Sequence, residues 1–133
     1  MRRRSVYARS RRIDGDVRVI DAGGCCVVPG LVDQHNHMEF TGMDVGNPAS
    51  LHEALAELVL LCGLPLADAL SLCTRNPAKR MRLPNKGELK PGADADILVL
   101  ERESLSIRAV VARGEIVFLD GRLLRRGTFE RDE

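Results

Sequence analysis

The chain has 133 residues, of which 44% are hydrophobic and 29% charged, and twenty basic residues against nineteen acidic ones give a net charge of +1. This composition is typical of a globular protein, and the length allows one small domain with a modest core. The balanced charge, the 3% aromatic content and the lack of an apolar run near ~18 residues argue against nucleic-acid and membrane partners. We therefore expect a cytoplasmic protein.

The first sixteen residues are locally basic, and their arginines are Arg2, Arg3, Arg4, Arg9, Arg11 and Arg12. No apolar stretch follows them, so they are not typical of a secretory signal. We interpret residues 1–16 as a disordered, solvated leader. An organellar transit peptide and a phosphate-binding arm stay open as alternatives.

Residues 17–37 form a β-segment that contains one or two strands within 17–29 and leads into two histidines, His35 and His37. Alternate side chains on a strand share a face, so both imidazoles are expected to point the same way. This spacing suits two ligands of one zinc ion or a related divalent metal. His35 and His37 are the metal-site candidates.

Residues 38–49 read as a loop, and Asp44 within it needs a separate judgement. Because it lies only seven residues before Leu51, where a helix has begun, we interpret it as a loop aspartate without a catalytic role.

Residues 50–83 form a helical segment whose first helix has a clear start and stop. Ser50 and Glu53 make a capping box, and Gly63 is a natural stop. One apolar face follows helical spacing through Leu51, Ala54, Leu55, Leu58, Val59 and Cys62. His52 falls on the polar side, where a solvated histidine is expected rather than a ligand.

Two shorter helices follow in the same segment. The second starts near Pro65, and its apolar face consists of Leu66, Ala69, Leu70 and Cys73. The third is predicted to have Asn76 as its N-cap and Pro77 as its first residue, with apolar Ala78 and Met81. We expect these faces to pack on each other, on the β-segment or on another chain.

Residues 84–133 form a C-terminal β-segment. It opens with a turn at Lys90-Pro91-Gly92, and the strands are predicted at 96–100, 107–112 and 115–119. Asp120-Gly121 favours a type I′ hairpin turn, because both positions require positive φ. Asp94 and Asp96 could be mistaken for a catalytic carboxylate pair, and we interpret them as caps of backbone amides.

The four cysteines, Cys25, Cys26, Cys62 and Cys73, lack the spacing of a metal finger. Cys25 and Cys26 are adjacent and should point to opposite faces of a strand, whereas Cys62 and Cys73 fall on apolar helix faces. Buried, reduced thiols are the expected state. A cysteine nucleophile would need a neighbouring base, and the sequence indicates none.

The run from Val28 through Asp33 to His37 resembles the first-strand metal motif of the amidohydrolase superfamily. The stretch 74–79 and the stretch 86–97 resemble the closing segment of the same superfamily, where the last barrel helix returns into a small β-domain. The C-terminal residues 112–130 are similar to the isoaspartyl dipeptidase branch. These matches cover roughly residues 17–37 and 50–130, in the order that the superfamily has them.

The resemblance implies a zinc-dependent hydrolase of amide bonds, in that branch of β-aspartyl peptides, with His35 and His37 as ligands of the more buried metal. It also offers an alternative for Asp44, as a remnant of the late-strand catalytic aspartate. In that branch, though, the aspartate lies well upstream of the last long helix. However, a (β/α)8 barrel takes about 250 residues, and positions 38 to 50, between His37 and Leu51, are only 13 residues. We therefore predict an α+β fold, a small sheet or partial sandwich with two to three helices and no complete TIM barrel.

Three functions remain in competition. The first is a truncated or internally deleted amidohydrolase in which no catalytic residue can be identified. The second is residual metal-hydrolase activity with ligands supplied by a partner or by oligomerisation. The third is a non-catalytic interaction module. Self-association through exposed apolar helix faces is expected, and a small peptide would be the substrate of complete relatives.

Overall fold

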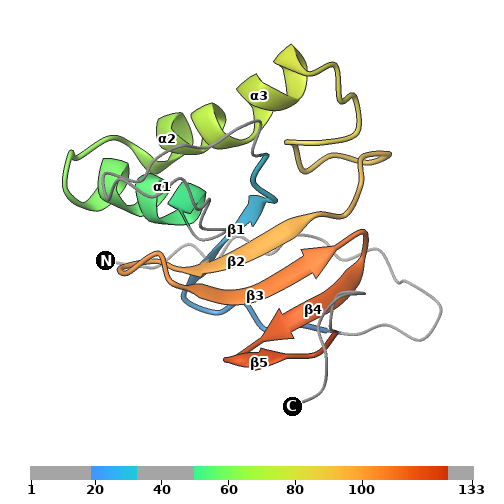
Figure 1. Ribbon diagram of the computed structural model, residues 1–133. Coiled ribbons are helices and arrows are strands. Elements are labelled where there is room, and N and C mark those ends of the chain that lie inside the picture. The colour runs from blue at the N-terminus through green and yellow to red at the C-terminus, as the bar shows by residue number, and fades with distance from the viewer. Residues whose placement is uncertain (1–18, 33–49, 126–133) are drawn as a thin grey trace, which may run out of the picture.

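The computed structural model describes residues 19–32 and 50–125, and within them a five-stranded sheet and three helices (Figure 1). The helices are α1 (Ser50–Leu60), α2 (Leu66–Cys73) and α3 (Arg75–Arg80). The strands are β1 (Cys25–Pro29), β2 (Ile97–Glu101), β3 (Ile107–Ala112), β4 (Glu115–Leu119) and β5 (Arg122–Leu123). This is the expected α+β fold, and no closed barrel is formed by the residues that the structure describes.

The sheet is fully antiparallel, with the order β1-β2-β3-β4-β5. Strands β2 to β5 follow one another along the chain, but β1 precedes all three helices and still pairs with β2, where Val28 is opposite Leu98. The long-range pairing of β1 with β2 therefore encloses the helical segment between two neighbouring strands.

The helices lie together on one face of the sheet, and the hydrophobic core lies between the two layers (Figure 1). Leu55 of α1 and Leu100 of β2 are completely buried, and the remaining members of the cluster are Val28, Ala69, Cys73 and Leu98. Burying a leucine side chain stabilises a fold by roughly 1.5–3 kcal/mol. The apolar helix faces thus pack on each other and on the β-segment. These are two of the three packing partners that the sequence predicted, and the third was another chain.

The β-segment agrees closely with the sequence prediction. The three predicted strands are β2, β3 and β4, and Leu98, Val99 and Leu100 are all buried, as a continuous apolar run indicates. Asp120 and Gly121 both have positive φ (45° and 81°), which is the backbone signature of a type I′ turn. Arg113 and Gly114 form a second turn of this kind, with φ of 50° and 81°.

Cys62 is where the prediction for the first helix is wrong. Helix α1 ends at Leu60, and Cys62 lies beyond it and is exposed rather than buried on the apolar face. Gly63, with φ of 71°, turns the chain, and the Leu64 amide returns to the Leu58 carbonyl at 2.9 Å. Reversing the chain so soon after Leu60 carries Cys62 away from the sheet. Ser50 begins the helix as expected, and its capping role stays a prediction.

The third helix also differs from the prediction. It begins at Arg75, so Asn76 and Pro77 lie inside its first turn, and Thr74 takes the position before it. The Thr74 hydroxyl donates to the Leu70 carbonyl at 2.6 Å, which continues the direction of α2 and allows α3 to start earlier. Met81 comes just after the helix and is 40% exposed, whereas Ala78 is buried.

None of the helices that the structure describes is long and apolar enough to cross a membrane.

Candidate functional site

The structure describes the approach to the histidine pair up to Val32. After β1, the Gly30 amide donates to the Asp96 carbonyl at 2.8 Å, and the Val32 amide donates to the Cys73 carbonyl at 2.8 Å. A Cβ on Gly30 would lie 2.9 Å from the Asp96 Cβ, so only glycine permits this close approach. Two backbone contacts therefore fix the path of the chain between β2 and the end of α2, three residues before His35.

His35, His37 and Asp44 lie outside the described residues, so their roles as metal ligands and loop aspartate stay predictions. Within residues 19–32 and 50–125 there is no group of three His, Cys, Asp or Glu side chains that could hold a metal ion. Catalytic zinc typically has three protein ligands. The described residues by themselves therefore provide no such set of three ligands.

His52 was predicted to be a solvated histidine on the polar side of α1, and this is wrong. The side chain is half-buried, and its Nε2 lies 2.7 Å from the carbonyl oxygen of Leu105 in the turn between β2 and β3. The turn brings the completely enclosed Leu105, with φ of 56°, against the start of the helix. His52 thus connects the helical layer to the sheet. The two residues are 53 positions apart in the sequence, so helical periodicity does not predict the contact between them.

Asp94 and Asp96 share one cation, Lys86. The Lys86 ammonium lies 2.8 Å from the Asp94 carboxylate and also contacts Asp96. Asp96 Oδ1 in addition accepts the Arg113 amide at 2.8 Å, which confirms for Asp96 the predicted cap of a backbone amide. The pair is therefore the anchor of a loop, and Lys86 is the member that the sequence interpretation missed. A lysine within ten positions of two aspartates in a turn-rich loop was the available signal.

The charges in this contact shift the protonation equilibria of its members. The hydrogen bonds that the Lys86 ammonium donates to the Asp94 and Asp96 carboxylates raise the pKa of Lys86, and the bond to Asp94 contributes most. The Lys86 hydrogen bond and then the Arg113 amide lower the pKa of Asp96, against the opposing effect of burial. Both shifts favour the charged forms, so the ion pair is retained at neutral pH.

The four thiols lie within the described residues, form no disulfide and have different surroundings. Cys73 is buried and Cys25 and Cys26 are half-buried, while Cys62 is exposed. Cys26 packs against the core, and the Cys25 sulfur lies on the other side of β1, 3.5 Å from Nη1 of Arg108. The opposite orientation of the adjacent cysteines is confirmed. The hydrogen bond to Cys25 and the Asp120 carboxylate raise the pKa of Arg108, which stays charged.

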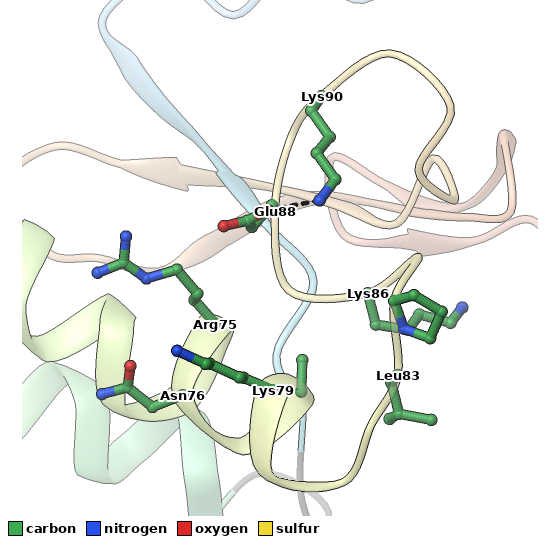
Figure 2. Close-up of a pocket in the computed structure, with 9 residues that line it drawn as sticks. Arg75, Asn76, Lys79, Leu83, Lys86, Glu88 and Lys90 are labelled. Carbon is green, nitrogen blue, oxygen red and sulfur yellow. Dashed lines mark hydrogen bonds and ion pairs between the residues drawn. The ribbon is translucent and has the colours of Figure 1, made fainter.

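Two hollows adjoin these features, and each has a volume of about 430 Å³. The first, at the exit of β1, is mostly apolar and is lined by Gly30, Leu31, Leu51, His52, Asp96 and residues of β2 and β3. The second lies between α3 and the following loop and is markedly basic; Figure 2 shows it. Its polar side chains are Arg75, Asn76, Lys79, Lys86, Glu88 and Lys90.

Comparison of the sequence and the structure with known proteins finds similarity to amidohydrolases. Residues 60–124 match the model of the family described as amidohydrolase family. Adenine deaminase 2 of Jannaschia sp. is 46% identical over 70 residues, covering 51% of this chain, and adenine deaminase of Clostridium perfringens is 37% identical over 81 residues, covering 60%. The structure of β-aspartyl dipeptidase from Fervidobacterium islandicum superposes with a TM-score of 0.58 and 36% identity over 69% of this chain. The chain belongs to the amidohydrolase superfamily.

The chain matches only a small part of these relatives. It spans 11% of the Jannaschia deaminase, 14% of the Clostridium deaminase and 24% of the β-aspartyl dipeptidase chain. The dipeptidase structure contains a β-Asp-Leu dipeptide. The matched family model covers α2, α3, strands β2 to β5 and the loop that carries Lys86, whereas His35 and His37 precede the matched residues in the sequence.

Proposed function

We propose that this chain is a barrel-less derivative of an amidohydrolase related to β-aspartyl dipeptidase, that it keeps the small β-domain with the last helices, and that it does not catalyse hydrolysis. The observation that supports this most is the pair of backbone contacts beyond β1. Val32 is hydrogen-bonded to Cys73 and Gly30 to Asp96, so the segment that leads to the histidines is attached to elements from the far end of the superfamily's domain.

The connection between these attached elements leaves no space for a barrel. Residues 33–49 join Val32 to the start of α1, and both ends of this connection belong to elements of one core. A (β/α)8 barrel of about 250 residues does not fit in such a connection. The strands that carry the remaining ligands, the catalytic base and the substrate loops in complete relatives therefore have no counterpart between Val32 and Ser50.

The chemistry of a metal hydrolase explains why this loss matters. A bound zinc lowers the pKa of its water and polarises the scissile carbonyl, but it needs about three protein ligands and an enclosed site. His35 and His37 would supply two neutral imidazole nitrogens, by resemblance to the superfamily. Two histidines alone hold the metal weakly and leave the reaction without an identified base.

The test is zinc content together with hydrolysis of β-Asp-Leu, measured on the purified chain and on a His35→Ala variant. We expect far less than one zinc per chain and hydrolysis no faster than the buffer rate. Both values should be the same in the variant. Near-stoichiometric zinc and zinc-dependent hydrolysis, both lost in His35→Ala, would overturn the proposal and support a site completed by a partner or by a second copy.

A second candidate function, an interaction module that self-associates, is favoured by the apolar side chains on the helical layer. Leu61 is 80% exposed, and Leu60 and Leu72 are 49% and 54% exposed. Exposed apolar groups of this size favour association. Sedimentation of the wild-type chain and of Leu61→Ser/Leu72→Ser should show association only in the wild type. A monodisperse wild-type monomer at high concentration would exclude this candidate.

A further inference from the structure

The basic pocket between α3 and the loop 83–90 is separate from the hollow at the exit of β1. Four of its lining side chains are cationic and one, Glu88, is anionic (Figure 2). This local excess of positive charge contrasts with a whole chain whose net charge is +1. A concave site lined mainly by groups of one charge is a candidate for binding an ion of the opposite charge.

The internal ion pairs leave two of the four cations available. Lys86 is engaged by Asp94 and Asp96, and Lys90 binds Glu88 at 2.7 Å. Arg75 and Lys79 have no carboxylate partner among the residues that the structure describes, and they extend to the same side of α3 (Figure 2). Like charges four residues apart on a helix repel each other, and an anion between them would relieve the repulsion.

Glu88 indicates where negative charge is already favourable. Its hydrogen bond to Lys90 lowers the pKa of its carboxyl, and the charge of Arg75 contributes to the same shift. The single carboxylate in the pocket therefore lies in the field of both Lys90 and Arg75. A ligand anion next to Arg75 and Lys79 would experience the same field.

The wall of the pocket is held in place by close packing. Gly87 has a φ of 77°, and a Cβ there would lie 2.6 Å from the Thr74 carbonyl oxygen and 2.9 Å from the Ala78 Cβ. The loop is thus seated directly on α3, and the Lys86 contacts fix its other end to Asp94 and Asp96. A pocket whose backbone wall is already positioned loses less entropy when a ligand binds than one whose wall must first become ordered.

We propose that this pocket binds the phosphate group of a small phosphorylated molecule through Arg75 and Lys79, with the Asn76 amide as a further donor. The planar guanidinium of arginine binds phosphate oxygens through two parallel hydrogen bonds, and lysine adds a point charge. A volume of about 430 Å³ exceeds what a lone phosphate fills, and Leu83 and Pro84 offer apolar surface for an organic group. This volume lies within the range of small-molecule pockets, which favours a small molecule over a nucleic-acid strand.

The experiment measures binding of inorganic pyrophosphate to the full chain by calorimetry at low, fixed ionic strength. The pocket variant is Arg75→Gln/Lys79→Gln, and the matched control is Arg102→Gln/Arg122→Gln, which removes two exposed arginines from the sheet side. Circular dichroism establishes that all three proteins are folded. Since these positions are exposed, both double variants are expected to keep the fold.

We expect saturable one-to-one binding that is weakened about tenfold or more in the pocket variant and unchanged in the control, because charge-assisted hydrogen bonds are lost. Absence of saturable binding, or equal weakening in both variants, would overturn the proposal. Tighter binding of a single-stranded oligonucleotide with equal sensitivity to both variants would also overturn it and assign the charge to a nucleic-acid surface. No outcome depends on zinc or hydrolysis.

Discussion

The two-layer core and the loop that follows α3 are stabilised by different forces. In the core, Leu55 and Leu100 are completely buried between helices and sheet, and burial of apolar surface dominates. In the loop, from Met81 to Asp96, the large apolar side chains Leu83 and Leu89 are partly exposed. The loop is held instead by the ion pairs of Lys86 and by the close packing of Gly87 against α3. The core therefore determines whether the chain folds, and the loop determines the shape of its basic pocket.

The strongest test of this comparison is Leu100→Ala, which removes a completely buried side chain from β2. We expect the free energy of unfolding to fall by about 2–5 kcal/mol, because the substitution loses apolar burial and leaves a cavity. Urea denaturation followed by circular dichroism measures the change. Leu123→Ala, at a position 54% exposed in the edge strand β5, should change it by less than about 0.5 kcal/mol. Equal effects would contradict the proposed location of the core.

The loop is tested by comparing Gly87→Ala with Gly92→Ala. Both glycines have positive φ (77° and 86°), but a Cβ at Gly92 would meet nothing within 4 Å, whereas at Gly87 it would lie 2.6 Å from a backbone oxygen. Gly92→Ala should cost about 1 kcal/mol, from backbone conformation alone. Gly87→Ala should cost about 2–3 kcal/mol, because the loop must also move away from α3. Thermal unfolding measures both, and equal losses would contradict the close packing of the loop.

Asp96→Asn should have the smallest effect, since it removes the charge that faces Lys86 but keeps an oxygen for the Arg113 amide. We expect a loss of about 0.5–1 kcal/mol at neutral pH, as for a partly exposed ion pair. A high salt concentration should reduce the difference between the two proteins.

The pH dependence of this contact follows from the lowered pKa of Asp96. The carboxylate contributes stability above its unfolded value of 3.8, and this stability is lost as the pH falls through the lower folded pKa. The wild-type chain should keep its greater stability over Asp96→Asn from neutral pH down to near pH 3.8 and lose it at lower pH. Unfolding measured at several pH values checks this, and a difference that persists at acid pH would contradict the role of the charge.

Local pattern explains which parts of the structure were predictable. The alternation and turn residues of the β-segment specify β2, β3, β4 and the type I′ turn at Asp120-Gly121, because strand periodicity and positive φ are properties of neighbouring residues. The apolar faces of α1 and α2 were also predictable, since helical spacing alone selects Leu55 and Ala69. The errors at Cys62, Asn76 and Met81 fall at helix ends, where the neighbouring chain reversal decides the outcome.

The sequence by itself therefore determined the superfamily, the order of helices and strands, and the absence of space for a barrel after His37. Only the tertiary structure decided how Lys86 joins Asp94 and Asp96, how His52 reaches Leu105, and how Gly87 closes the basic pocket against α3. These contacts join side chains to partners in other loops and elements. The residue pattern of a single element carries no information about which distant group will lie beside it.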